Sequence, residues 1–317
     1  MRLARVNAAL HRSGSKLAAL ASAGDLDLLQ LDYPEPEARA YSAAFFEQLR
    51  TLHKQFFLEP SLRLVTNAGG GAVIACVERL GSYLREHGDA AMPITAVRGD
   101  NLLPRLSELT AAGIELTDES TGQPLVEIKQ PLLSAQVELG AGPLAAAWNE
   151  GSRMAIAGCY DPAAPFIAAS KAELVLAWDD CDALARVAVA AHAALLGQAI
   201  AEMPAPDQLT LETLKTEQLV AHGLVRKLRE LALDGHLLRQ ADVDCDISSL
   251  AVCPTDVGGL SFAGVTGREP IGSWRVRLTF ATGNMVDSTR RTEVRWSRVQ
   301  RDAVHVSVDT RPASEWL

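Results

Sequence analysis

The stretch LRLVTNAGGGAVIACVERLG, residues 62–81, decides how the first part of the chain is expected to fold. An apolar run ends at Thr66, Asn67 follows, and three glycines at residues 69–71 lead directly into a sequence with helical spacing. This pattern predicts a strand, a turn and a helix. Glycines at such a turn can bring backbone N–H groups up to a bound anion, or can serve only to make the turn tight. The stretch by itself leaves both interpretations open.

The alternation of strand and helix continues on both sides of this stretch. Short apolar segments predict strands, and longer segments with helical spacing predict helices. The strands are expected at residues 26–33, 62–67, 93–100 and 152–159, and the helices at residues 3–24, 37–60, 72–88, 101–113 and 178–200. Strands separated by whole helices indicate βαβ units and a largely parallel sheet.

Polar residues stand at or just beyond the ends of these predicted strands, at Asp32, Asn67, Asp100 and Asp161. In open α/β sheets, ligands bind in the crevice beyond the carboxyl ends of the strands. We therefore expect the chemistry of the protein at these four positions, provided that the strands are parallel.

The pattern changes at residues 201–208, where Pro204 and Pro206 interrupt the helical spacing. A helical segment follows at residues 211–233. Later segments alternate with a period of two, as half-buried strands do; they are residues 247–253, 273–281, 290–299 and 303–310, with a hairpin turn expected at residues 281–284. We predict an α/β fold in which a mostly parallel sheet flanked by helices (residues 1–203) is followed by an α+β portion with antiparallel strands (residues 204–317). The second portion packs on the first sheet or forms its own small domain.

Composition limits the classes of partner. The 317 residues are 48% hydrophobic and 22% charged, with a net charge of −9, which gives no electrostatic case for a nucleic-acid or anionic-membrane partner. Residues 261–317 depart from this balance, with nine Arg, no Lys and six acidic residues; we interpret them as a solvated arginine-bearing sheet face. A mean hydropathy of +0.06 favours a homo-oligomer.

Nothing in the sequence predicts export or membrane insertion. The N-terminus carries three arginines without a continuous apolar stretch, and no run of about 18 apolar residues occurs. Five cysteines without metal-ligand spacing are typical of a reducing compartment. We therefore expect a cytoplasmic protein.

Cofactor motifs are absent. The sequence contains no G-x-G-x-x-G, no G-x-x-x-x-G-K-[ST] and no G-x-S-x-G, and thus no motif for NAD, ATP or metal, so the cofactor stays unknown. His192 lies in an apolar helical segment and is either a hydrogen-bonded core residue or a site residue. Asp242, Asp244 and Asp246 alternate, as on one strand face or in a cation loop, but the EF-hand pattern is missing.

Several segments, in order along the chain, resemble the AtuA-like family, named for acyclic terpene utilisation in bacteria. LVTNAGG resembles the N-A-G-G turn of that family, AVRGDNL its V-x-G-D-[DN]-L stretch, and WDDCDALARVAVAAH its tryptophan-rich helix with a Gly-His pair. Asp100, Asp161 and His192 lie at motif positions of the family, and their residue types make them the expected catalytic residues if the protein is an enzyme. We expect the ligand to be bound by Asn67, Gly69, Gly70, Gly71, Gly99 and Gly158.

The resemblance places the chain beside enzymes that process acyl-CoA in branched-chain and terpenoid breakdown, and implies a small acid or an acyl-CoA as ligand. Two hypotheses follow: an enzyme with proton chemistry near a carbonyl, or a non-catalytic binding or accessory subunit. Three departures favour the second. The chain is expected to begin directly in a helix instead of a glycine-rich strand-to-helix turn, Cys159 replaces an arginine of the family, and the long glycine-rich loops after residue 197 are missing.

Overall fold

The computed structural model describes residues 1–7, 25–34, 40–197, 199–205, 208–213, 221–256, 259–282 and 291–316. At its centre, five parallel strands lie side by side in the order β1 (Arg2–Asn7), β2 (Leu28–Asp32), β3 (Arg63–Thr66), β6 (Met154–Ala157) and β4 (Pro93–Arg98). These strands read as apolar runs instead of alternating, because helices cover both faces of the sheet. In β2 and β6, for example, every apolar side chain is buried.

Antiparallel strands extend this sheet on both sides. β7 (Ala199–Ala205), β8 (Gln208–Thr213), β12 (Leu260–Ala263) and β11 (Ala251–Pro254) continue outward from β1, and β16 (Ser307–Pro312) pairs with β4. The complete order is β11-β12-β8-β7-β1-β2-β3-β6-β4-β16, a ten-stranded sheet. Strands from both ends of the chain therefore share one sheet.

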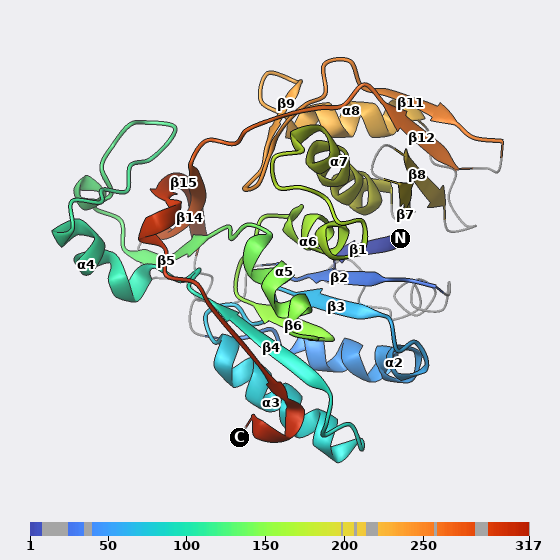
Figure 1. Ribbon diagram of the computed structural model, residues 1–317. Coiled ribbons are helices and arrows are strands. Elements are labelled where there is room, and N and C mark those ends of the chain that lie inside the picture. The colour runs from blue at the N-terminus through green and yellow to red at the C-terminus, as the bar shows by residue number, and fades with distance from the viewer. Residues whose placement is uncertain are drawn as a thin grey trace.

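Two layers of helices cover the parallel strands (Figure 1). α2 (Ala44–Leu58) and α3 (Val73–Glu86) lie on one face, where Phe45, Leu49 and Leu80 are completely buried. α5 (Gly142–Asn149), α6 (Ala164–Glu173) and α7 (Cys181–Gly197) lie on the other. α7 is apolar nearly all round, since it is packed between the sheet and the C-terminal elements.

Two small antiparallel sheets complete the fold. β13 (Thr266–Arg268), β10 (Asp244–Asp246) and β9 (Leu237–Arg239) form a sheet that packs on α7, close to α8 (Ala221–Leu231). β15 (Arg291–Gln300), β14 (Ser273–Thr282) and β5 (Leu132–Val137) form the other, beside α4 (Leu106–Ala111). Short 3₁₀ turns are η1 (Leu103–Arg105), η2 (Leu125–Glu127), η3 (Arg301–Ala303) and η4 (Ala313–Glu315).

The expected fold class is confirmed: a largely parallel central sheet with flanking helices is followed by antiparallel strands. Strands on both sides of the expected boundary at residues 203 and 204 join the large sheet, and this boundary falls within β7. Division into separately folding units stays a prediction.

The helix expected at residues 3–24 is wrong at its start, because residues 2–7 form β1. Residues 3–6 of β1 are buried on both faces of the strand, and periodicity cannot distinguish such a short run from a helix. Residues 8–24 lie outside the described residues. Of the first departure, the expected helix at the start is therefore corrected to a strand, whereas the position of the glycine-rich turn falls on residues outside those described.

The helical spacing gives way to strands before residues 201–208, because α7 ends at Gly197 and β7 and β8 follow and pair with each other. A shift of register between Glu202 and Ala205 accommodates Pro204, which cannot donate to a regular ladder. The helix expected at residues 211–233 is limited to α8 in the described part, and the expected helix at residues 101–113 is divided into η1 and α4. β14 and β15 pair as expected, but the hairpin turn is misplaced: β14 continues to Thr282, and residues 283–290 lie outside the described residues.

Candidate functional site

The carboxyl ends of the five parallel strands lie at one edge of the sheet, because all five run in the same direction. Asp32 ends β2, Asn67 follows β3, Asp100 follows β4 by two residues and Asp161 follows β6 by four. The topology thus brings together the four positions that the sequence selected.

The glycine turn after β3 is tightly packed and hydrogen-bonded to the backbone around it. Gly70 has a φ of +47°, a conformation that favours glycine, and a Cβ added to Gly69 would lie 2.7 Å from the carbonyl oxygen of Ala157. The N–H of Gly69 donates to that oxygen (3.1 Å), and the N–H of Gly70 donates to the carbonyl of Asn67 (3.2 Å). These contacts favour the tight-turn interpretation. Ligand binding by Asn67, Gly69, Gly70 and Gly71 stays a prediction.

The side chain of Asn67 fastens this turn to the end of β2. Its Oδ1 accepts the N–H of Tyr33 (2.7 Å), and its Nδ2 donates to the carbonyl oxygen of Tyr33 (3.0 Å). A single amide therefore makes both hydrogen bonds that the Tyr33 backbone offers, as a neighbouring strand would do. Both polar atoms of Asn67 have protein partners.

Asp100 is buried beneath the turn, with 2% of its surface exposed. Gly158 packs against its carboxylate and against the carbonyl of Gly70, and a Cβ at residue 158 would overlap both. Burial raises the pKa of Asp100 to about 7, although nearby backbone N–H groups act in the opposite direction. Gly99 has a φ of +118° and packs against the backbone of His305. Asp100 and Gly158 thus bring the segments that follow β4 and β6 into close contact, whereas Gly99 packs against the segment before β16.

Asp161 connects α6 with the segment before β10. Its Oδ1 accepts the N–H of Ala163 (2.8 Å) near the start of α6, and its Oδ2 accepts the N–H of Ala241 (2.7 Å). Burial raises the pKa of Asp161 to about 8, and repulsion from Glu138 and Asp242 adds to the effect, while the two backbone donors oppose it. A neutral carboxyl group at neutral pH can donate a proton as well as accept a hydrogen bond.

His192 lies on α7, and its tautomer follows from its neighbours. Gln240 Nε2 donates to the carbonyl oxygen of Arg239 (2.8 Å), which leaves Gln240 Oε1 to accept from His192 Nε2 (3.1 Å). Burial lowers the pKa of His192 to about 4, and the charge of Arg5 lowers it further. The ring is therefore neutral at pH 7, with its proton on Nε2 and its lone pair on Nδ1. A proton-donor role would require the imidazolium, which is scarce at that pH.

A buried polar network next to His192 was missed by sequence reasoning. Arg5 Nε donates to Asp32 Oδ2 (2.6 Å), while Gln30 Nε2 and the Tyr160 hydroxyl donate to Asp32 Oδ1 (2.9 and 3.1 Å). Burial raises the pKa of the Tyr160 hydroxyl, so it stays protonated. Two polar residues within apolar strands, Arg5 in β1 and Gln30 in β2, were the available signal.

A cleft of about 1010 Å³ lies between α7, β9 and the β14–β15 pair. Asp161 and His192 line it, and Asn67, Asp100 and the glycine turn are not among its lining residues. Charged side chains are frequent on its walls: Asp118, Glu119, Glu138, Arg239, Arg275, Glu293, Arg295 and Arg298. The structure thus brings two of the three predicted catalytic residues into one cleft and separates the third.

Two of the three alternating aspartates are explained by local bonding. Asp242 Oδ2 accepts the N–H of Ala141 next to α5 (2.7 Å), and Asp246 accepts the N–H of Ser248 (2.9 Å) and pairs with Arg268 (2.7 Å). In the part of the chain that is described, no group of three or more His, Cys, Asp or Glu side chains is arranged to hold a metal ion. No described helix is long and apolar enough to cross a membrane.

The chain matches the model of one known protein family. The model of a family described as acyclic terpene utilisation family protein AtuA matches residues 13–201, more than half of the chain. The chain belongs to the AtuA family. No curated protein and no solved structure matches it significantly.

The AtuA match includes all of the predicted site residues, from Asn67 to His192, and ends within β7. The resemblance inferred from the sequence is therefore confirmed at the level of the family. The match does not include the later strands β9, β14 and β15, which supply one wall of the cleft. That wall therefore lies outside the matched residues.

Proposed function

We propose that the cleft binds a small carboxylic acid or an acyl-CoA intermediate of branched-chain or terpenoid breakdown, and that the protein catalyses a proton transfer next to its carbonyl group. The observation that carries this proposal is that Asp161 and His192 line the same cleft as four arginines. Guanidinium groups suit carboxylate and phosphate ligands. Membership in the AtuA family supports the substrate class.

The environments of the two groups support a division of roles. Burial raises the pKa of Asp161 to about 8 and lowers that of His192 to about 4, so at neutral pH a protonated carboxyl group faces the same cleft as a neutral imidazole. Pairs of groups whose pKa values are moved apart are typical of acid–base sites. We assign His192 Nδ1 as the proton acceptor and Asp161 as the group that orients or protonates the carbonyl oxygen.

A non-catalytic binding or accessory subunit is the second candidate, and a specific observation favours it. The side chains of Asn67 and Asp161 and the N–H groups of Gly69 and Gly70 are all hydrogen-bonded to the protein backbone. In addition, Cys159 is buried where the family has an arginine that could pair with an anion. A protein that keeps these residues for packing alone would bind a ligand without transforming it.

Deuterium exchange separates the two candidates. Purified protein is incubated with isobutyryl-CoA in D₂O, and the mass of the recovered ligand is measured by mass spectrometry. We expect one deuterium at the α-carbon with the wild type and a loss of exchange in His192→Gln, because the proton acceptor is removed. The matched control Glu150→Gln changes an exposed residue at the end of α5 and should exchange as the wild type does.

Binding is measured in parallel by thermal unfolding with isobutyryl-CoA and isobutyrate. A rise in Tm without deuterium exchange would support the binding subunit and contradict catalysis. A well-folded protein that shows neither a Tm shift nor exchange with any acyl-CoA or branched acid of a wider panel would contradict both candidates.

A further inference from the structure

Two arginines of the β14–β15 pair are placed against each other. Arg275 on β14 lies directly opposite Arg298 on β15 in the antiparallel register, and both line the cleft. Like charges at directly opposed positions destabilise a sheet unless an anion lies between them. The interpretation of these strands as a merely solvated arginine face therefore leaves this pair unexplained.

In this structure the anion is a side chain of the protein. Glu119 Oε1 lies 2.6 Å from Arg298 Nε, and its Oε2 lies 4.0 Å from Arg275 Nε. The guanidinium carbon of Arg275 lies 3.9 Å from the centre of the Trp296 ring, and this stacking fixes the plane of its donors. Glu119 thus occupies a position where two guanidinium groups converge.

The backbone that carries Glu119 is held independently of its carboxylate. The N–H of Glu119 donates to the carbonyl oxygen of Trp296 (2.8 Å). The neighbouring Asp118, with 1% of its side chain exposed, accepts the N–H groups of Ser120 (2.8 Å) and Thr121 (3.1 Å). The Glu119 side chain is one-third exposed and can rotate away without movement of this turn.

Two further acidic side chains interact with the arginines that face Glu119. Glu138 interacts with Arg275, Arg277 and Arg298, which lower its pKa, although burial has the larger effect and raises it. Asp244 also interacts with Arg298, but it lies directly opposite Arg239 and interacts with that residue more strongly. Arg275 and Arg298 nevertheless both face the carboxylate of Glu119, at 4.0 and 2.6 Å.

We propose that Arg275 and Arg298 form a binding site for the phosphate group of a ligand, and that Glu119 occupies this site until the ligand displaces it. A phosphate monoester carries a charge of about −1.5 to −2 and three acceptor oxygens, so it neutralises both guanidinium groups, which the single charge of Glu119 does not. Binding exchanges one set of ion pairs for another and needs no covalent step. The inference deepens the proposed function and rests on it for the use of this cleft as the ligand site.

Titration with inorganic phosphate tests the site directly. Calorimetric titrations are run at pH 7.5 with ionic strength held constant by NaCl, on the wild type and on variants. Glu119→Gln should tighten phosphate binding about two- to fivefold, because a partly exposed competing ion pair is removed. Arg298→Gln should weaken it at least about tenfold, and Arg298→Lys should lie between, since it keeps the charge but loses the planar donors.

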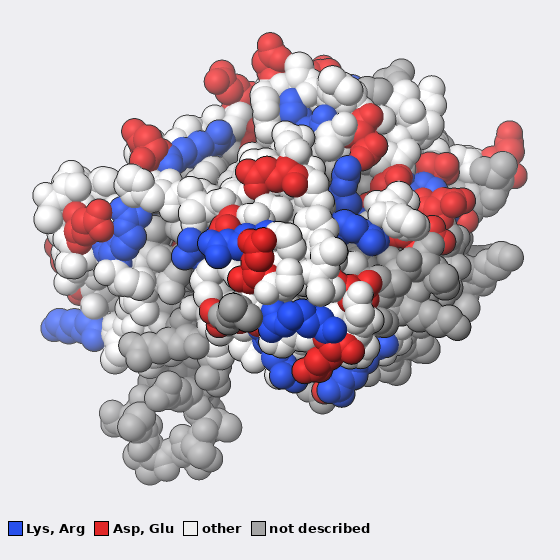
Figure 2. All heavy atoms as spheres, turned by 60° about the horizontal axis from the view of Figure 1, so that its bottom comes forward, with Lys and Arg blue, Asp and Glu red and all other residues white. Residues whose placement is uncertain are grey.

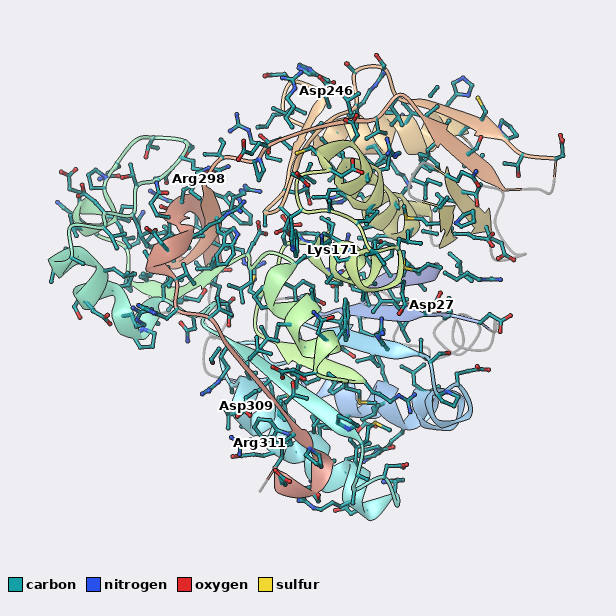
Figure 3. The ribbon with its side chains drawn as sticks, in the orientation of Figure 1. Asp27, Lys171, Asp246, Arg298, Asp309 and Arg311 are labelled. Atoms are coloured by element: carbon teal, nitrogen blue, oxygen red, sulfur yellow. The ribbon has the colours of Figure 1, made fainter. Side chains whose placement is uncertain are left out.

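Asp309→Asn is the matched control for Glu119→Gln. Asp309 pairs with Arg311 at 2.6 Å with similar exposure, on β16 and well separated from Arg298 (Figure 3). It should leave phosphate binding unchanged. Circular dichroism and the unfolding midpoint establish that each variant is folded.

The sign of the Glu119→Gln effect decides the proposal. Weaker or unchanged phosphate binding in folded Glu119→Gln would overturn it, as would acetate that binds as tightly as phosphate, since acetate carries one charge. The result is separable from the proposed function. Phosphate binding as expected, without binding of any acyl-CoA or acid, would contradict only the proposed function, whereas isobutyrate binding without phosphate binding would contradict only the phosphate site.

Discussion

Asn67 gives the sharpest distinction between a structural and a ligand-binding role for the glycine turn. The substitution Asn67→Ala removes both hydrogen bonds to the Tyr33 backbone, which measure 2.7 and 3.0 Å. A hydrogen bond of this kind contributes roughly 0.5–1.5 kcal/mol. We therefore expect the free energy of unfolding to fall by about 1–3 kcal/mol, with the binding of isobutyryl-CoA by the folded variant unchanged.

Urea denaturation followed by circular dichroism measures the loss of stability. Calorimetry in buffer without urea, at a low temperature, measures ligand binding by the folded variant. Asn149→Ala, an exposed substitution in the last turn of α5, is the control and should change the free energy of unfolding by less than about 0.5 kcal/mol. The reasoning is refuted if Asn67→Ala leaves stability unchanged and abolishes ligand binding, because Asn67 would then serve the ligand instead of Tyr33.

Three further outcomes are expected. Gly70→Ala should lower the free energy of unfolding by about 1–2 kcal/mol in urea denaturation, since alanine is strained at a φ of +47°. His192 should stay neutral in ¹H–¹⁵N NMR down to about pH 4. Because the histidine binds a proton more readily in the unfolded chain, the free energy of unfolding should fall as the pH drops from about 6.5 to 4. His192→Gln should remove that part of the loss. Asp161 acts in the opposite sense: its raised pKa of about 8 means that stability falls as pH rises from about 4 to 8, and Asp161→Asn should flatten this part of the profile.

The central sheet could be predicted because its strands are short apolar runs that end in polar residues. Asp32, Asp100 and Asp161 were found in this way, and parallel strands necessarily bring their carboxyl ends to one edge. β1 was missed because a six-residue run buried on both faces has no period that separates strand from helix. Because β1 was missed, Arg5 was not recognised as the partner of Asp32.

The cleft was beyond sequence reasoning for a different reason. Its walls come from α7, β9, β14 and β15, which are distant along the chain, so their approach depends on tertiary packing. No local pattern places Gln240 against His192 or Glu119 between Arg275 and Arg298. The hydrogen bonds between Asn67 and the Tyr33 backbone likewise depend on the approach of β2 and β3, which no local pattern predicts.

The distribution of charged residues over the surface could not be predicted from the sequence either. On the face shown in Figure 2, acidic and basic side chains are interspersed, so the net charge of −9 is not gathered there. The arginines that matter most for the proposals lie in the cleft instead. A count of residues along the sequence could detect their excess but could not say what they face.

The most direct test of the catalytic cleft is whether His192 responds to a ligand. Long-range ¹H–¹⁵N spectra of histidine-labelled protein, with His192 assigned through His192→Gln, are recorded during titration with isobutyryl-CoA. We expect His192 to carry its proton on Nε2 before ligand is added, and its Nδ1 resonance to shift as the ligand saturates the protein. Saturation by isobutyryl-CoA with no change at His192, or a His192 ring that is protonated on Nδ1 at the start, would contradict this expectation.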